Sequence, residues 1–186
     1  MTPRRQRILL TCAVPALGYW GFVAFDSWNF QRIEGRELDR IQSVGPPIAS
    51  QNSTVLADAL IGRIEVRRVG LSAMVVEGTT TAALKRAAGH ISGTGMPGTA
   101  GNVGIAAHRD TFFRPLRNIR KNDIITLTTI TAEYRYRVVS TKVVDPADVS
   151  VLNAGDREIL TLVTCYPFYF VGSAPDRFVV RAERII

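Results

Sequence analysis

Cysteine and histidine are scarce in this sequence of 186 residues, which holds only two of each. Two histidines and one cysteine outside the apolar N-terminal run are too few for a zinc site of any usual spacing. A calcium site needs clustered carboxylates, and the 16 acidic residues are scattered along the chain. No phosphate-binding loop or dinucleotide-binding glycine pattern is present either. We therefore expect neither a metal nor another cofactor.

A basic run with interleaved aromatic residues, which is typical of nucleic-acid binding, is also missing. The formal net charge is +7, and Arg4, Arg5 and Arg7 supply three of those charges. The remainder is too small to indicate a nucleic-acid partner. The hydrophobic content of 46% suffices for a core without disulfides, and the length allows one domain plus an appendage.

The N-terminal region predicts a membrane anchor. Residues 1–7 form a basic stub, and residues 8–25 contain no charge before Asp26. As a helix, the run 8–25 extends about 27 Å at ~1.5 Å per residue, close to the ~30 Å hydrocarbon core of a bilayer. The basic flank predicts a cytoplasmic N-terminus and an extracytoplasmic remainder of the chain. Two rival interpretations exist. One is a cleaved signal peptide, although no convincing cleavage site precedes Asp26, and the other is a lipoprotein signal, which would need a small residue before Cys12, where Thr11 fits poorly.

Residues 26–58 predict a helical stalk with a linker, and residues 59–186 predict the folded domain. Apolar spacing near 3.6 marks the stalk helix over residues 26–43, and Gly45-Pro46-Pro47 ends it. The domain contains roughly eight short strands separated by turn signals, which indicates an all-β barrel or a sandwich. The expected strands cover residues 61–66, 72–76, 89–91, 102–108, 123–129, 134–138, 159–165 and 177–185, with short helices at 79–88 and 112–118.

The stretch Thr161-Leu162-Val163-Thr164-Cys165 joins a strand to a thiol. The strand stops at Pro167, because proline has no N–H to donate to a ladder. Cys165 is therefore held at the rim of a sheet. A lone thiol in a folded domain is either a structural cysteine or a nucleophile. An unperturbed thiol has a pKa of ~8.5, so a nucleophile needs a cation or base nearby.

This stretch resembles the TLxTC signature of the sortases, cysteine transpeptidases that attach proteins to bacterial cell surfaces. Ala107-His108-Arg109-Asp110 and Asp176-Arg177-Phe178-Val179-Val180 are similar to the histidine and arginine blocks of that family, in the same order. The continuation Cys-Tyr-Pro-Phe is most similar to class D sortases. The resemblance runs from Ile61 to the C-terminus and implies a closed eight-stranded β-barrel with short helices.

The resemblance also implies catalytic roles for Cys165, His108 and Arg177. Cys165 would attack a peptide carbonyl, His108 would protonate the leaving amine, and Arg177 would stabilise the oxyanion. The competing histidine, His90, precedes a glycine-rich loop and lacks the strand-end placement expected for His108. Arg181 lies on the same strand face as Arg177, so motif position rather than charge selects Arg177.

Thr164, Tyr166 and Phe168 are the candidate substrate-binding residues. Thr164 and the backbone N–H of Cys165 are candidate donors to the oxyanion. Aromatic residues in the loop 166–176 either line a substrate groove or pack against the domain, and the sequence leaves both interpretations open.

These observations predict a single-pass membrane protein whose catalytic domain is extracytoplasmic. The implied reaction cleaves an LPxTG-like sorting signal near the C-terminus of a surface protein through a Cys165 thioester. An amine from a cell-wall precursor or another protein would then accept the acyl group. Two alternatives remain: a cysteine peptidase that uses water as the acceptor, and a non-catalytic, membrane-tethered domain that binds peptides.

Overall fold

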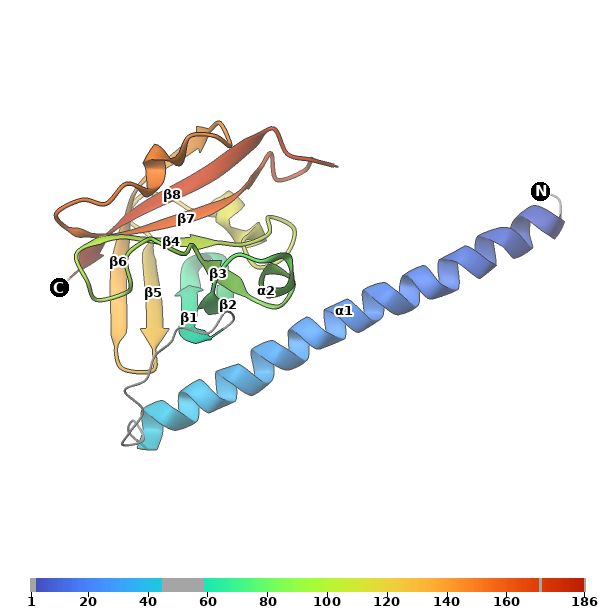
Figure 1. The fold of residues 1–186 in the computed structure, drawn as a ribbon, viewed down its shortest axis with the longest axis horizontal. Helices are drawn as coiled ribbons and strands as arrows, with labels where there is room; N and C mark the ends of the chain where they lie inside the picture. The colour runs from blue at the N-terminus through green and yellow to red at the C-terminus, as the bar shows by residue number, and fades with distance from the viewer. Residues whose placement is uncertain (1–2, 45–58, 171, 186) are drawn as a thin grey trace.

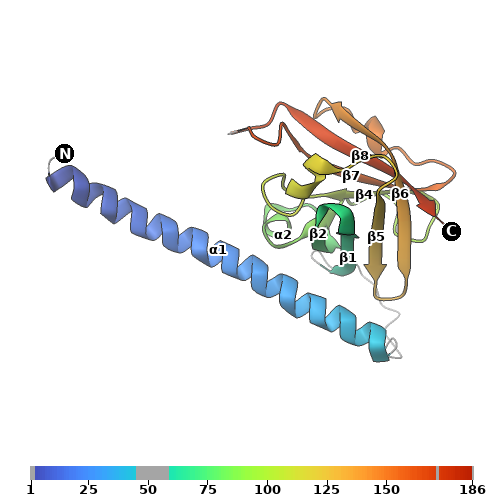
Figure 2. The same cartoon turned by 180° about the vertical axis from the view of Figure 1, so that it is seen from behind.

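A long helix lies beside a β-barrel (Figures 1 and 2). The computed structural model describes residues 3–44, 59–170 and 172–185, without the side chains of residues 3–17, 20, 41, 42 and 44. Helix α1 (Pro3–Val44) continues without interruption through the predicted anchor and the predicted stalk helix. Within the part of the chain that the structure describes, no helix has a stretch long and apolar enough to cross a membrane. The predicted linker after α1 lies outside the described residues.

Eight strands close into a barrel in the order β1-β2-β3-β4-β7-β8-β6-β5. The β2–β3 and β4–β7 pairs are parallel, and the other neighbouring pairs are antiparallel. The closed barrel confirms one of the two architectures that the strand pattern allowed. The strands are β1 (Leu60–Val66), β2 (Leu71–Glu77), β3 (Ala88–His90), β4 (Gly101–Ala106), β5 (Ile124–Thr129), β6 (Glu133–Val144), β7 (Glu158–Tyr166) and β8 (Asp176–Ile185). The short helices are α2 (Thr81–Arg86), η1 (Arg67–Val69), η2 (Arg114–Asn118) and η3 (Val149–Leu152).

Alternating apolar residues fill the barrel, because successive side chains of a strand point to opposite faces. On β7, Leu160 and Leu162 are fully buried, and on β8 Val180 is fully buried. Residues between these positions face the outside of the barrel. The outward face of β7 carries Cys165, so the thiol stands on the surface rather than in the core.

Two predicted strand boundaries are wrong. The strand expected over residues 134–138 continues to Val144 in β6. The strand expected to reach His108 ends at Ala106. Beyond it, Ala107 N–H still donates to the carbonyl of Val163 at 3.3 Å, but the carbonyl of His108 accepts from the N–H of Phe113 at 3.1 Å. That bond turns the chain toward η2, so His108 follows the strand instead of ending it.

The second half of α1 docks against the barrel beside α2. Leu38 is fully buried, and Phe30 packs against a small cluster of buried residues. The Gln31 side chain accepts from Met74 N–H and donates to the carbonyl of Arg86, both at 2.8 Å. The residues of the cluster are Val76, Ala83 and Ala87. The predicted stalk helix is therefore packed on the folded domain in this structure.

Candidate active site

Cys165 and Arg177 are direct cross-strand partners. They stand opposite each other in the antiparallel β7–β8 pair, and both are half-buried. Residues opposite each other have Cβ atoms about 4.5–5.5 Å apart and share a face. The Arg177 guanidinium donates to the carbonyls of Asp176 at 3.0 Å and Ala174 at 3.4 Å, which holds it at the start of β8. The residues that carry the thiol and the cation therefore occupy neighbouring backbone positions at one rim of the barrel.

His108 lies on the other side of Cys165. In the parallel β4–β7 pair, Ala106 is the partner of Val163. The hydroxyl of Thr164 donates to the carbonyl of Ala107 at 2.7 Å, which continues the same register by one residue. His108 comes one residue after Ala107, in the segment that leaves β4 at the rim where β7 ends. His108 is exposed, so its imidazole is accessible to a bound substrate.

Arg109 is a residue of this site that the sequence analysis did not single out. Its side chain is only 6% exposed, and its guanidinium lies 5.9 Å from the ring centre of Phe170. The guanidinium donates to three carbonyls of the loop that follows Cys165: Pro167 at 3.1 Å, Phe170 at 2.6 Å and Gly172 at 3.1 Å. Arg109 therefore ties that loop to the segment that carries His108. Its position directly after His108 in the motif is the sequence feature that could have identified Arg109 as a residue of this site.

His90 has a structural environment. It ends β3, contrary to the expectation that it lacks a strand-end position, but its side chain is almost fully buried. Nδ1 lies 2.6 Å from a carboxylate oxygen of Glu77. Nε2 lies 2.9 Å from the carbonyl of Gly95 and 3.0 Å from the Thr94 hydroxyl. Nδ1 is thus paired with β2 and Nε2 with the glycine-rich loop, whereas His108 is exposed at the rim.

The three candidate substrate-binding residues have different surroundings. Thr164 is buried on the inner face of β7, where its hydroxyl is bonded to Ala107, so it does not stand beside the thiol of Cys165. The rings of Tyr166 and Phe168 lie 6.0 Å apart, and Phe168 packs against the core. The sequence left open whether the loop aromatics line a groove or pack, and Phe168 packs.

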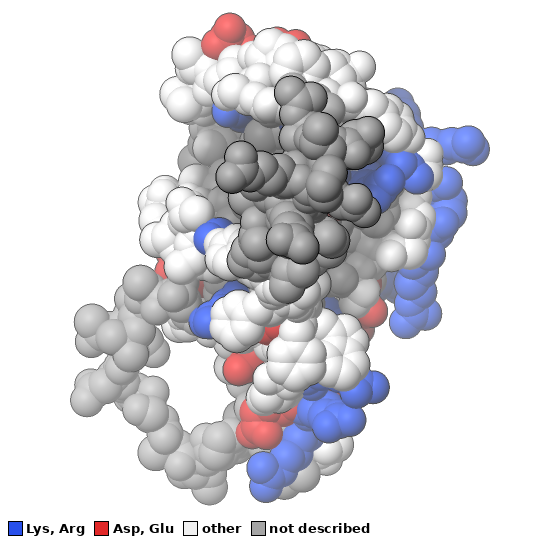
Figure 3. All heavy atoms as spheres, turned by 90° about the vertical axis from the view of Figure 1, so that its right-hand side faces the viewer, with Lys and Arg blue, Asp and Glu red and all other residues white. Residues whose placement is uncertain are grey.

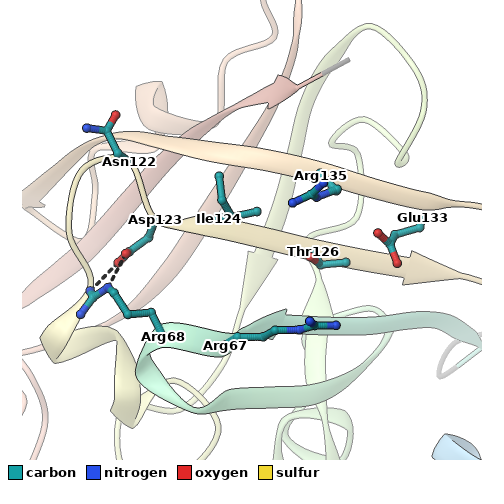
Figure 4. A pocket seen from close by; sticks show the side chains of 8 residues that line it. All are labelled: Arg67, Arg68, Asn122, Asp123, Ile124, Thr126, Glu133 and Arg135. Atoms are coloured by element: carbon teal, nitrogen blue, oxygen red, sulfur yellow. Dashed lines mark hydrogen bonds and ion pairs between the residues drawn. The ribbon is translucent and has the colours of Figure 1, made fainter.

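Two surface cavities lie on outer faces of the barrel. One, of about 370 Å³, lies over β6, β7 and β8 beneath η3, on the face that carries Cys165. The other, of about 530 Å³, lies beside β5 and η1 (Figure 4) and contains the ion pair between Arg68 and Asp123. None of the predicted site residues lines this larger cavity.

Basic side chains also gather along one edge of the molecule, apart from most acidic ones (Figure 3).

Residues 64–185 match the family model described as the sortase domain. The chain belongs to the sortase family. Sortase D of Bacillus subtilis strain 168 is 34% identical over 125 residues, which are 67% of this chain and 63% of that relative. Sortase A of Listeria monocytogenes is 36% identical over 112 residues, which are 58% of this chain and 50% of the relative. The chain thus spans less than two thirds of the length of these two curated sortases.

Solved sortase structures share the fold. The structure of the Sortase D5 transpeptidase of Clostridium perfringens matches with a TM-score of 0.67 and 26% identity, covering 86% of this chain and 98% of that one. Sortase A of Listeria monocytogenes matches with a TM-score of 0.64 and 32% identity, covering 69% and 89%. The predicted sortase barrel and the predicted likeness to class D sortases are confirmed.

Proposed function

We propose that this sortase-family protein is a cysteine transpeptidase anchored to the bacterial cell membrane. The observation that carries the proposal is the adjacency of three strand ends. His108 lies two residues beyond the end of β4, Cys165 is the last residue but one of β7, and Arg177 is the second residue of β8. β7 lies between β4 and β8 in the barrel. A nucleophile flanked by an acid–base group and a cation is the set that acyl transfer requires.

In the proposed first half-reaction, the Cys165 thiolate attacks the carbonyl carbon of the scissile peptide bond in an LPxTG-like sorting signal. The bond between Thr and Gly breaks, and His108 donates a proton to the leaving amine. Arg177 stabilises the negative charge on the carbonyl oxygen. The product is a thioester between Cys165 and the surface protein.

In the second half-reaction, an amine attacks the thioester carbonyl, and His108 accepts a proton from that amine. The carbon–sulfur bond breaks and Cys165 leaves as the thiolate, which restores the enzyme. The proposed partners are surface proteins with C-terminal sorting signals and an amine from a cell-wall precursor or a protein.

The proposed anchor is the run 8–25 of α1, with residues 1–7 in the cytoplasm and the barrel outside. The packing of Phe30 against the cluster that contains Val76, and the hydrogen bonds of Gln31 with Met74 and Arg86, support a fixed relation between α1 and the catalytic domain. Fractionation of cells that express the full chain tests the anchor. We expect the protein in the membrane fraction, and recovery in a salt-washed soluble fraction would contradict the proposal.

Mass spectrometry of the full chain in detergent tests the reaction. The protein is incubated with LPxTG-like peptides and with a glycine peptide or a diamine as acceptor. We expect a thioester adduct on Cys165 and a ligated product, and neither with the Cys165→Ala variant. Hydrolysed peptide without ligation would indicate a peptidase, and no adduct with any peptide would indicate a binding domain.

A further inference from the structure

The outer face of β7 and β8 forms a regular floor that leads away from the catalytic pair. Residues two apart on a strand share a face, so each second cross-strand pair faces outward. Starting from the rim, the outward pairs are Cys165 with Arg177, Val163 with Val179, and Thr161 with Arg181. On the next strand, β6, Lys142 stands beside Val179, and Ser140 stands beside Arg181. The outward pair that contains Arg181 is therefore two outward pairs away from the pair that contains the thiol.

The cavity of about 370 Å³ lies over this floor. Its far wall is built by η3, which is fixed to the sheet through Asn102. The Asn102 side chain donates to the carbonyls of Val151 at 3.0 Å and Asn153 at 3.3 Å, and accepts from the Thr161 hydroxyl at 2.7 Å. The lining residues are Ser140, Lys142, Ser150, Val151, Thr161, Val179 and Arg181. A polar network therefore holds the wall in place.

Among the residues that the structure describes, the lining of the cavity contains two basic side chains, Lys142 and Arg181, and no acidic one. The described part of the chain offers no hydrogen-bond or ion-pair partner to the side chains of Arg181 and Lys142. Asp148, in the adjoining loop, instead accepts from Ser150 N–H at 3.2 Å and caps η3. Glu183 follows Arg181 on the same face, but it is outside the lining and forms no ion pair with Arg181 in the described structure.

We propose that this cavity is a specificity subsite in which Arg181 and Lys142 bind an acidic side chain of the peptide substrate. An arginine fork and a lysine together provide charge-assisted donors suited to a carboxylate. The inference rests on the proposed transpeptidase function and adds a requirement on the substrate outside the sorting motif.

The strand geometry gives the position of that acidic residue. Thr161 precedes Cys165 by four residues, which is about 13 Å at ~3.3 Å per residue. An extended peptide that follows the floor covers this distance with four residues. We assign the subsite to the acyl side of the substrate, because that part stays bound through both half-reactions. In an LPxTG-like signal that is cut after Thr, the acidic residue is the one immediately before Leu.

Peptide competition in the full chain tests the subsite. Two peptides that differ only in Glu or Gln before the Leu of the signal are mixed with one amine acceptor, and the ratio of their kcat/KM values is measured. We expect the Glu peptide to be preferred by about tenfold, because charge-assisted hydrogen bonds to a carboxylate contribute about this much to binding. Both kcat/KM values are measured with the same enzyme variant, so a change in the overall activity of that variant does not affect their ratio.

Variants then assign the preference to residues. We expect the Glu-to-Gln ratio of kcat/KM to fall to about one in Arg181→Gln and to fall partly in Lys142→Gln. With Arg181→Glu, a third peptide that carries Lys at the same position should be preferred over the Glu peptide. Arg135→Gln is the control, because Arg135 is an exposed arginine that lines the other cavity (Figure 4). Its ratio should equal that of the unchanged protein.

Three results would overturn the subsite. Equal rates for the Glu and Gln peptides, with ligated product from both, would remove the subsite and leave the proposed function intact. An Arg181-dependent preference for an acid on the C-terminal side of the scissile bond would contradict the acyl-side assignment. No product from any peptide would overturn the proposed function itself, and the subsite with it.

Discussion

The hydroxyl group of Thr164 donates a hydrogen bond to the backbone carbonyl of Ala107 at 2.7 Å. This bond joins the residue before Cys165 to the residue before His108. Thr164 is buried, so the bond is shielded from water. It therefore helps to hold together the two chain segments that carry the proposed nucleophile and the proposed acid–base group.

Replacing Thr164 with valine tests this role. Thr164→Val keeps the shape of the side chain but leaves the Ala107 carbonyl without this donor, which costs about 1–3 kcal/mol of unfolding free energy. We also expect slower thioester formation, because the His108 segment loses its register. Urea unfolding and single-turnover kinetics measure the two effects. Thr126→Val is the control, with a change within about 0.5 kcal/mol; an equal effect in both variants would contradict the role.

Arg109 should act as a positioning residue for the loop after Cys165. Arg109→Gln removes donors to three carbonyls, so we expect faster proteolysis within residues 167–172 and a raised KM for the sorting peptide. Arg109→Lys keeps the charge and should restore part of the KM. The exposed Arg117, which bonds the Tyr169 hydroxyl at 2.9 Å, provides the control Arg117→Gln. An unchanged KM in Arg109→Gln would argue against loop positioning.

The docked stalk should contribute to the stability of the domain. Leu38 is fully buried, whereas Ile33 on the same helix is 55% exposed. Leu38→Ala should destabilise the full chain by about 2–5 kcal/mol, because the substitution leaves a cavity at a fully buried position of α1. Ile33→Ala should change stability by about 0.5 kcal/mol or less. Thermal unfolding in detergent compares the two, and similar small losses would mean that α1 does not pack on the barrel in solution.

The ion pair between Arg68 and Asp123 should make stability depend on acid pH. The hydrogen bond from Arg68 lowers the pKa of the Asp123 carboxyl, with further support from the Arg120 N–H at 2.7 Å. A lowered pKa in the folded state adds stability above the unfolded pKa of about 3.9, and this is lost as pH falls through the folded value. The gap in Tm between the unchanged protein and Asp123→Asn should therefore be largest above about pH 5 and should close in acid.

The exposed Asp156 has no ion-pair or hydrogen-bond partner in the described structure, so Asp156→Asn is the control for that titration. Its Tm should follow the unchanged protein across the range. A gap for Asp123→Asn that stays constant down to pH 3 would contradict the ion-pair explanation.

Local patterns predicted much of the fold. Alternation located most strands, and the predicted short helix at 79–88 is present as α2, which Thr80 caps by accepting from Ala83 N–H at 3.1 Å. Alternation also placed Thr164 on the face opposite to Cys165, so its burial followed from the sequence even though a substrate contact was predicted. The strand was predicted to reach His108, but the hydrogen bond from Phe113 N–H to the His108 carbonyl turns the chain before that residue. The apolar composition of the segment does not predict such a hydrogen bond.

The sequence by itself determined which segments of the domain form strands and which motif blocks they carry, because strand periodicity, proline and the three blocks are local in the chain. Only the tertiary structure decided that β4 lies beside β7, that Arg109 holds the loop after Cys165, and that Arg181 lines a cavity on the face of the thiol. These contacts join segments separated by many residues. They exist because the barrel closes, and closure depends on long-range strand pairing that no short stretch encodes.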